Sequence, residues 1–452
     1  MSEERGRARD FGIPLTGEPG EWNAITDVPG VQVGYVTLTG GDDVRTGVTA
    51  LLPRGRDGVG TPCAAGWHSL NGNGEMTGTA WLEESGSLAV PVLLTNTYAV
   101  GPVHRGVVEW VRTHRRDMAP EWLLPVVTET WDGYLHDIHG AHVTPAHAGA
   151  AIDAAAGGPV AEGGVGGGTG MRCYGYKGGS GTASRVVRYG AERYTVGVFV
   201  QANFGARREL VVAGAPLGRE LSEAARGDGG GSGSGGSGGA AGTGAGGGPD
   251  AGTGRGDGSY ESGEGPGDPE DPVDSVSPVD SASPVDSARP VSPADSVGPV
   301  RSPSPVDPER PVPPGAGSVI VVVATDAPLL PGQCKALARR VPLGLARTGT
   351  TGSHFSGDLF LAFSTANPGA LTSTFPPRPA AEGDAGEDAP YETLRFIPWG
   401  RVDPFHTAVV EAVEEAVLNV LTAAEPMTGR DGHHVPAFPL AALAGLRQAR
   451  TG

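Results

Sequence analysis

A serine that directly follows a glycine-rich junction is the first candidate for chemistry in this chain. A long Gly-, Ser- and Pro-rich tract ends in Pro314-Gly-Ala-Gly317, and Ser318 then opens the β-branched run Ser-Val-Ile-Val-Val-Val-Ala. Cleavage of the Gly317–Ser318 bond would make Ser318 an N-terminal residue, whose hydroxyl could be a nucleophile with its own near-neutral α-amine as base. Glycine before the serine would let the scissile peptide adopt a strained geometry. Taken alone, the junction also fits a linker that simply ends.

Four other polar residues, Glu129, Asn203, Ser356 and Asp358, have ordinary structural interpretations when each is taken alone. Glu129 fits an ion pair or a cap, and the other three fit turns. Single residues therefore do not decide the function.

A histidine cluster offers a metal-dependent hydrolase as an alternative, because such residues can bind zinc. The spacing His-x-x-His-x-x-His matches neither an i, i+4 pair on a helix nor a zinc finger, and nearby glycines favour a loop. The cluster consists of His136, Asp137, His139 and His142, with His433-His434 later in the chain. We expect structural or solvated histidines without a metal, and we keep the metal hydrolase as the alternative.

Two other segments point to non-hydrolytic roles. The run Gly164-Val-Gly-Gly-Gly-Thr-Gly170 lacks the Lys-Ser/Thr of a phosphate loop, so close backbone packing is favoured over nucleotide binding. Pro-x-x-Pro spacing, which aromatic grooves bind, recurs in Pro305-Val-Asp-Pro-Glu-Arg-Pro311. A tract this rich in proline produces that spacing by chance, so we interpret it as a spacer rather than as a scaffold for partners.

Charge and cysteine content exclude several classes of protein. The 452 residues carry a formal net charge of −18, and the tract 227–314, with 14 acidic and 4 basic residues, accounts for −10 of it. No basic run exists, so nucleic-acid binding is not expected. No apolar stretch long enough for a membrane span and no secretory-signal pattern is present, and three cysteines without a disulfide pattern fit a reducing compartment. We therefore expect a cytoplasmic protein without a membrane segment.

The candidate residues must be positioned by the strands and helices that flank them. Continuous or alternating apolar runs predict strands, most of them buried on both faces. Helices are expected at 101–112, at 331–340 with a proline in the first turn, and from Asp403-Pro404, as N-cap and first helical residue, to about Ala424. The expected strands lie within 27–38, after a turn, and at 89–95, 124–128, 194–200, 318–324 and 359–364.

These elements fall into two blocks of one α/β domain. We expect residues 1–226 to form its first part, 227–314 to be a disordered linker, and 315–452 to form its second part. The Gly/Ser/Ala-rich sequence and the degenerate Ser-Pro-Val-Asp repeats of the linker cannot bury enough apolar surface to offset chain entropy. So long a loop inside a compact domain is unusual, but cleavage at its end would remove the need to join the two blocks.

Longer motifs resemble one enzyme family. The segment Gly317-SVIVVVATDAPLLPGQCKALARRVPLGLARTGTTG is similar to the start of the small chain in the L-aminopeptidase D-amidase/D-esterase family (peptidase family S58), which includes the β-peptidyl aminopeptidases. The resemblance covers the chain except for 227–314 and about a dozen residues at each end. Further matching stretches are Ile25-TDVPGVQVGYVTL, Ser69-LNGNGEMTGT, Glu129-TWDGYLHDI, Gly164-VGGGTGMRCYGYKGGSGTASR, Gln201-ANFG, Phe355-SGDLFLAFSTAN and Glu425-PMTGRDGHHV.

The resemblance implies roles for residues on both sides of the tract. Ser318 matches the self-cleaving nucleophile, which is freed by cleavage after Gly317. Asn203, in Gln-Ala-Asn-Phe-Gly, matches the amide that donates to the oxyanion. Ser356 and Asp358 match the serine and acidic residue that would orient the nucleophile and hold the ammonium form of its amine. Many members have Glu where this chain has Asp358, so the reach of that contact is shorter here.

Residues that face the substrate follow from the same resemblance. Glu129 matches the carboxylate that binds the free amino group of the substrate, which would explain action from the N-terminus. A Tyr that supplements the oxyanion hole in some members is Trp131 here; its indole N–H can donate from a different place, and Tyr134 is a second candidate donor. Asn96, in Thr-Asn-Thr, lies in a segment that faces the cleft and is a candidate for substrate contact.

The resemblance implies an αββα sandwich of the aminopeptidase/ornithine acetyltransferase type. The implied activity is that of a self-cleaving serine aminopeptidase or amidase, which removes N-terminal residues from peptides, amides or esters by acyl transfer through Ser318 and needs no cofactor. Members assemble as oligomers of the cleaved heterodimer, so we expect a homo-oligomer that acts on peptide or aminoacyl-amide substrates. An ornithine acetyltransferase-like acyltransferase is a second alternative, disfavoured because those enzymes use Thr as the nucleophile.

Overall fold

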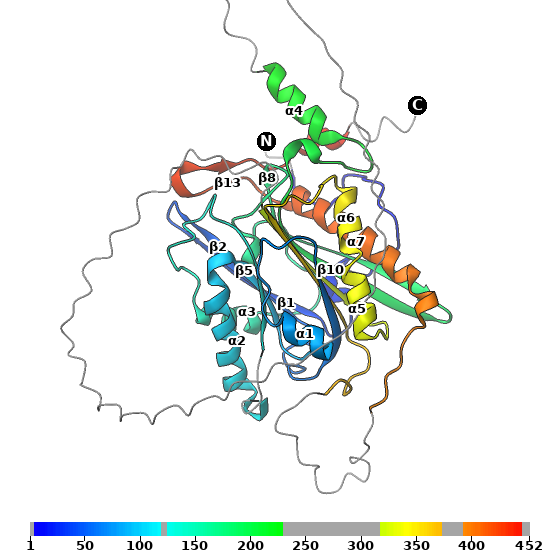
Figure 1. Ribbon diagram of the computed structural model, residues 1–452. Helices are drawn as coiled ribbons and strands as arrows, with labels where there is room; N and C mark the ends of the chain where they lie inside the picture. The colour runs from blue at the N-terminus through cyan, green and yellow to red at the C-terminus, as the bar shows by residue number, and fades with distance from the viewer. Residues whose placement is uncertain (1–3, 119–123, 229–316, 373–391, 445–452) are drawn as a thin grey trace, which may run out of the picture. The chain divides into compact units, whose positions relative to one another are not determined.

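The computed structural model describes residues 4–118, 124–228, 317–372 and 392–444 of the chain (Figure 1). Residues Met1–Gly231 and Val312–Gly452 form one unit, and a second unit, Ser232–Pro311, lies outside the described residues. The expected linker also lies outside them, except for Gly227 and Asp228, which end helix α4 (Leu217–Asp228).

The larger of the two main sheets brings together strands from both ends of the chain. Its order is β4-β3-β12-β11-β10-β9. β11 pairs with β10 in antiparallel and with β12 in parallel orientation. Strands from before and after the 227–314 tract are therefore direct neighbours. The six strands are β3 Cys63–Ser69, β4 Ser87–Leu88, β9 Gly179–Tyr189, β10 Glu192–Asn203, β11 Gly317–Thr325 and β12 Ser356–Ser364.

The smaller sheet consists of four strands in the order β1-β2-β5-β6. β5 and β6 run parallel, while β1, β2 and β5 are antiparallel neighbours. The strands are β1 Gln32–Gly40, β2 Val44–Leu52, β5 Val92–Asn96 and β6 Val126–Thr130. Two short ribbons complete the strands, β7 Arg172–Cys173 with β8 Tyr176–Lys177 and β13 Met427–Thr428 with β14 His434–Val435.

Helices cover the outer face of each sheet, so the domain is an αββα sandwich (Figure 1). α2 and α3 pack on the smaller sheet, whereas α5 and α7 pack on the larger sheet and α6 packs on α7. Three apolar clusters follow from this layering, with one between each sheet and its helices and one between the sheets. The bounds of the described α-helices other than α4 are α1 Thr79–Ser85, α2 Val100–His114, α3 Pro145–Asp153, α5 Pro331–Ala338, α6 Val341–Arg347 and α7 Asp403–Ala423.

Strand β11 shows why this architecture fits the sequence. Alternate residues of its β-branched run enter different layers, because successive side chains of a strand point to opposite faces. Val319, Val321 and Val323 join the cluster under the helices, and Ile320 and Val322 join the cluster between the sheets. Burial of each such side chain contributes about 1.5–3 kcal/mol. The same alternation puts Ser318 on the face of β11 that is directed toward the other sheet.

The helices and strands predicted from sequence patterns are confirmed, with small shifts of their ends. The expected helices at 101–112 and 331–340 correspond to α2 and α5. One detail was wrong: α7 begins at Asp403, and Val402 is its N-cap residue, so the Asp403 side chain lies in the first turn instead of capping it. Strands β2 and β9 and helix α3 were not predicted, since they are rich in Gly, Ala, Ser and Thr and give weak patterns.

Two further observations concern the described part of the chain as a whole. None of its helices has both the length and the apolar character needed to cross a membrane. Cys63, Cys173 and Cys334 are all free thiols and all buried.

Candidate active site

Ser318 lies at the start of β11, between two other strand ends. Its register partner on β10 is Asn203, and its register partner on β12 is Gly357. The Ser318 side chain is 2% exposed. The backbone N–H of Trp131, in the loop after β6, donates to its Oγ at 3.3 Å. Three segments that are far apart in the sequence therefore meet at this hydroxyl.

The side-chain amide of Asn203 is fixed at both ends. Its Oδ1 accepts a hydrogen bond from the backbone N–H of Arg172 at 2.9 Å. Its Nδ2 donates to the carbonyl of Trp131 at 2.7 Å. These two bonds decide which end of the amide is the donor and direct the N–H groups toward the segment that also contacts Ser318. The amide is thus preorganised as a donor beside the hydroxyl.

The two aromatic candidates for the oxyanion contact have different surroundings. The Trp131 indole lies against Gly133, where an added Cβ would be 2.6 Å from the ring. The group of Trp131 that reaches Ser318 is its backbone N–H, which any residue type would supply. The Tyr134 ring stacks on His433 with centroids 4.4 Å apart, and the guanidinium of Arg172 lies 3.9 Å from the ring centroid.

Glu129 is a buried carboxylate at the end of β6. Its Oε1 accepts from the backbone N–H of Glu75 at 3.1 Å, and its Oε2 accepts from the hydroxyl of Thr97. Burial raises the pKa of Glu129, while these hydrogen bonds oppose the rise. Both partners are uncharged, so the negative charge of the carboxylate is left uncompensated. Such a site is suited to an ammonium group.

Ser356 and Asp358 are residues of β12, not of a turn before it. The Ser356 hydroxyl donates to Asp358 Oδ1 at 2.5 Å, and both side chains are buried. Asp358 is the register partner of Val319, and strand alternation puts both on the face that is covered by helices. The carboxylate therefore lies on the opposite face of the sheet from the Ser318 side chain.

Gly317 occupies a position that a larger residue would not fit. A Cβ at this residue would lie 1.8 Å from the carbonyl oxygen of Asn203 and 2.9 Å from its carbonyl carbon. The backbone N–H of Gly317 donates to Phe355 O at 3.3 Å. The peptide bond that precedes Ser318 is therefore pressed closely against the end of β10.

The side chain of Asn96 is fully used within the fold. Its Oδ1 accepts from the backbone N–H groups of Tyr98 and Ala99, at 3.1 and 3.0 Å, and caps the short turn that follows β5. Its Nδ2 donates to the Thr46 hydroxyl at 2.9 Å. This capping orients the adjacent Thr97, which holds Glu129.

The histidine cluster does not form a metal site in the structure. Within the described residues, no group of three or more His, Cys, Asp or Glu side chains could hold a metal ion. The His136 Nδ1 lies 3.2 Å from both Asp43 O and Arg45 N, and burial lowers the pKa of His136 to about 4. The His139 ring packs on Tyr98 instead, with centroids 5.1 Å apart. The metal-dependent alternative therefore has no support.

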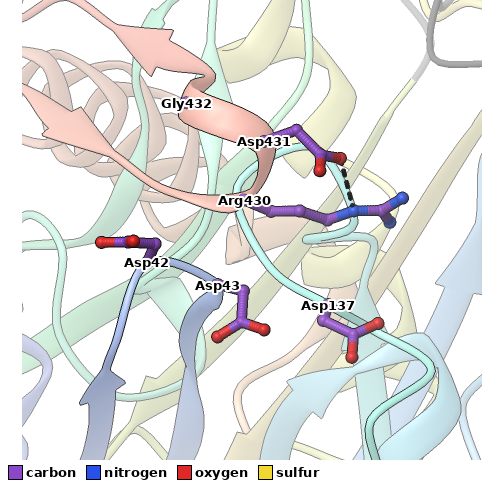
Figure 2. A pocket seen from close by; sticks show the side chains of 6 residues that line it. All are labelled: Asp42, Asp43, Asp137, Arg430, Asp431 and Gly432. Carbon is purple, nitrogen blue, oxygen red and sulfur yellow. Dashed lines mark hydrogen bonds and ion pairs between the residues drawn. The ribbon is translucent and has the colours of Figure 1, made fainter.

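An acidic pocket lies beside the same loop (Figure 2). It has a volume of about 560 Å³ and is formed by the β1–β2 turn, the loop after β6 and the β13–β14 turn. Its lining residues are Asp42, Asp43, Asp137, Arg430, Asp431 and Gly432. None of these residues belongs to the group around Ser318, so the pocket is not part of the candidate active site.

The glycine-rich run packs inside the domain, as the sequence favoured. An added Cβ would lie 2.3 Å from Gln201 Oε1 at Gly167 and 2.5 Å from the backbone nitrogen of Ser180 at Gly168. Gly166, Gly167 and Gly168 are buried. No space is left along these three residues for a phosphate group.

The structure adds residues that were not singled out from the sequence. Asn71 contacts Asp358 through both ends of its amide, and Thr97 and the Glu75 backbone hold Glu129. Two signals were present: Asn71 lies in the motif Ser-Leu-Asn-Gly-Asn-Gly, and Thr97 follows Asn96 directly. Neither signal indicates which residue Asn71 or Thr97 would contact, because the hydrogen-bond partners are distant in sequence.

Comparisons with known proteins show which family the chain resembles over its length. The chain matches the model of peptidase family S58 over residues 23–435. It is 42% identical to the β-peptidyl aminopeptidase BapA of Sphingosinicella microcystinivorans over 98% of this chain and 92% of that protein. A solved β-aminopeptidase of Burkholderia sp. is similar with a TM-score of 0.72 at 37% identity, covering 98% of this chain and 99% of that one.

A second solved structure extends the likeness. The L-aminopeptidase D-Ala-esterase/amidase of Ochrobactrum anthropi is similar with a TM-score of 0.71 at 36% identity, covering 98% of each chain. That enzyme is described as a prototype for the serine aminopeptidases and as a variant of the Ntn hydrolase fold.

Proposed function

We propose that Ser318 is the nucleophile of this chain once the Gly317–Ser318 bond has been cut. The premise is that the chain belongs to peptidase family S58 and is therefore a hydrolase of the N-terminal-nucleophile aminopeptidase type. One observation carries this proposal: Ser318 opens a buried strand with Asn203 opposite and the Trp131 N–H on its Oγ. The proposal includes the division of the domain into a first part up to about residue 226, a linker, and a second part that begins at Ser318.

In the first step, the Ser318 hydroxyl acts on the chain itself. Its Oγ attacks the carbonyl carbon of Gly317, the C–N bond to Ser318 breaks, and the Ser318 nitrogen takes a proton to become an amine. Water then hydrolyses the resulting ester and leaves Gly317 as a C-terminal carboxylate. The tight fit of Gly317 against Asn203 supports this step, because it constrains the peptide bond that must be attacked.

In the second step, the freed Ser318 acts on a substrate. We assign the substrate's ammonium group to Glu129, whose carboxylate accepts hydrogen bonds from two uncharged groups, the Glu75 N–H and the Thr97 hydroxyl. The α-amine of Ser318 takes the proton from Oγ, the oxygen forms an ester with the acyl group, and the proton passes to the leaving amine. Water then releases the acyl group and restores the hydroxyl.

Two donors are assigned to the tetrahedral oxyanion. The Asn203 Nδ2 is the first, and the Trp131 backbone N–H, 3.3 Å from Ser318 Oγ, is the second. This backbone donor is present whichever side chain stands at position 131. Asn96 and Tyr134 are assigned to the walls of the cleft, since the polar groups of Asn96 are used in capping and the Tyr134 ring in stacking.

Ser356 and Asp358 are assigned to the amine of Ser318 and not to its hydroxyl. Their position on the helix-covered face of β12 supports this division. An ionised Asp358 would stabilise the ammonium form that appears while the proton is carried from Oγ to the leaving group.

The substrates are proposed to be N-terminal residues of peptides, amides or esters. The named activities of the relatives suggest β-residues, small L-residues and D-alanyl amides or esters as the first candidates. We further propose a homo-oligomer of cleaved heterodimers and a cytoplasmic location, the latter supported by three free buried thiols.

The proposal is tested with the purified full-length chain and its Ser318→Ala variant. Mass spectrometry should find two polypeptides, 1–317 and 318–452, in the parent protein and one uncut chain in the variant. A panel of chromogenic aminoacyl amides should be hydrolysed by the cut protein alone, with or without EDTA. An active protein that remains uncut would overturn the assignment of Ser318.

A further inference from the structure

We infer that Asn71 is a positioning residue for Asp358, and that the loop Asn71–Glu75 holds both carboxylates of the site in place around Ser318. This inference rests on the proposed function, in which Asp358 acts on the Ser318 amine and Glu129 binds the substrate.

Asn71 contacts Asp358 with both ends of its side-chain amide. Its Nδ2 donates to Asp358 Oδ2 at 3.0 Å, and its Oδ1 accepts from the Asp358 backbone N–H at 2.7 Å. The same Nδ2 also donates to Ser353 O at 3.0 Å. Ser356 holds the other carboxylate oxygen, Oδ1. The two side chains together fix the position of the Asp358 carboxylate and its rotation.

The other end of the loop reaches the second carboxylate. The backbone N–H of Glu75 donates to Glu129 Oε1 at 3.1 Å. Between the two ends, Gly74 packs on Gly357, the register partner of Ser318. A Cβ at Gly74 would lie 3.0 Å from Gly357 Cα, and one at Gly357 would lie 2.3 Å from the Asn73 carbonyl oxygen. The loop is therefore in direct backbone contact with the strand beside the nucleophile. A displacement of either end of the loop would change the positions of both carboxylates.

The chemical role of Asn71 is to favour the ionised form of Asp358. Burial raises the pKa of Asp358, whereas the hydrogen bonds from Ser356, Asn71 and the Val319 backbone N–H lower it. None of these three donors carries a charge. Removal of the Asn71 donor leaves burial less opposed, so the carboxyl group should take up a proton at higher pH.

Few titratable groups in the described structure face this carboxyl group. Glu75 lies on the same loop, Glu129 on the far side of Gly74, and His68 on the neighbouring strand, opposite Phe360. Burial, together with the positive charges of Arg339 and Lys335, lowers the pKa of His68. After cleavage the Ser318 amine joins them, and it titrates together with Asp358 as a coupled pair.

The test compares Asn71→Ala and Asn71→Asp with the control Asn367→Ala, which should leave kcat, KM and the acid limb at their parent values. Asn367 follows the other end of β12, and its amide is likewise bound at both ends, donating to Arg395 O and accepting from the Arg395 N–H at 2.9 Å each. We expect Asn71→Ala to lower kcat about tenfold at pH 7 with KM unchanged, and to move the acid limb of kcat upward by about one pH unit. Asn71→Asp keeps the size of the parent side chain and should move the acid limb further upward, because it places a second carboxyl group beside that of Asp358.

The same measurements in an Asp358→Asn background separate this inference from the proposed function. With Asp358 removed, Asn71→Ala should cost less than about twofold in kcat, since the partner is gone. An unshifted acid limb in both Asn71 variants, or equal losses in both backgrounds, would overturn the role of Asn71 alone. If Asp358→Asn keeps the parent kcat and the parent rate of cleavage, the assignment of Asp358 fails and the inference fails with it.

Discussion

Asn203 and Ser318 face each other across the β10–β11 ladder, and the backbone of Trp131 contacts both side chains. The Trp131 carbonyl accepts from Asn203 Nδ2 at 2.7 Å, and the Trp131 N–H donates to Ser318 Oγ at 3.3 Å. The ladder holds the donor and the hydroxyl at a fixed separation, although 114 positions separate them in the chain. Their geometry is therefore as rigid as the sheet itself.

The close approach of Gly317 to Asn203 predicts that self-cleavage needs a glycine. In Gly317→Ala the new Cβ would overlap the Asn203 carbonyl oxygen, and the strand end would have to move. Overpacking of this kind typically costs about 1–3 kcal/mol, so cleavage should slow by about 10- to 100-fold. Gel densitometry against time after synthesis measures this rate.

The control for this substitution is Gly400→Ala, since nothing lies within 4 Å of a Cβ added there. That variant should be cut at the parent rate. Cleavage of Gly317→Ala at the parent rate would mean that the close contact has no part in the reaction.

The uncompensated charge of Glu129 predicts a specific pH dependence of substrate binding. Burial raises the pKa of Glu129, so its carboxylate becomes protonated at higher pH than an ordinary Glu as the solution is acidified. A protonated Glu129 cannot bind an ammonium group, and kcat/KM should fall through that raised pKa. Glu129→Gln should lower kcat/KM about 30- to 100-fold near pH 7 and remove this limb, because a charge-assisted hydrogen bond is lost.

The matched control is Glu75→Gln, which keeps the backbone N–H that holds Glu129 and changes only an exposed side chain. Its kcat/KM should stay close to the parent value, and its acid limb should move slightly downward because a neighbouring negative charge is removed. Equal kcat/KM for Glu129→Gln and the parent enzyme across pH would contradict the assignment of Glu129 to the substrate amine.

A buried ionic network should control the stability of the helix layer. Glu415 on α7 accepts from Arg9 at 2.8 Å, from Arg185 at 2.7 Å and from Asn23 at 2.5 Å. Its side chain is fully buried. Glu415→Gln removes the carboxylate that both arginines share and leaves Arg185 with its longer contact to Glu411, at 3.5 Å. Breaking a buried pair in this way costs about 3–5 kcal/mol. The Tm at a fixed scan rate should fall by several degrees.

The pH dependence of this network has a definite sign. Burial alone would raise the pKa of Glu415, but Arg9, Arg185 and Asn23 hold it below its usual value. Its stabilisation is therefore present above the pKa of an unfolded Glu and is lost as pH falls through the lower folded pKa. The Tm difference between Glu415→Gln and the parent should shrink in that acidic range. Glu18→Gln, an exposed carboxylate paired with Arg188 and Arg193, serves as the control and should leave the Tm unchanged.

Deletion of Ser232–Pro311 tests the proposed linker. This segment is the second unit of the chain, whereas β10 and β11 pair with each other inside the first unit. Shortening a connection changes its closure entropy only slowly with length, so cleavage and kcat should remain within about twofold of the parent values. An uncut or aggregated product would show that the segment has a structural role in the first unit.

The sequence by itself determined the elements and the kinds of chemistry available. The β-branched run after Ser318 could only be a strand buried on both faces, and the proline at the start of 331–340 and the apolar stripe of 403–423 predicted helices that the structure contains. These features are local, since they depend on side-chain shape and spacing within a few residues. The longer motifs, through their resemblance to one enzyme family, named Ser318, Glu129, Asn203, Ser356 and Asp358 as chemical candidates.

Only the tertiary structure decided how the candidates are related. Ladder register puts Asn203 opposite Ser318, and strand alternation puts Asp358 on the opposite face of the sheet from the Ser318 side chain. The tertiary structure also showed that Trp131 contacts the Ser318 hydroxyl through its backbone N–H. The contact between Asn71 and Asp358 could be found only in the folded structure. The two residues are 287 positions apart, so their hydrogen bond depends on which strands pair, and no local pattern specifies that pairing.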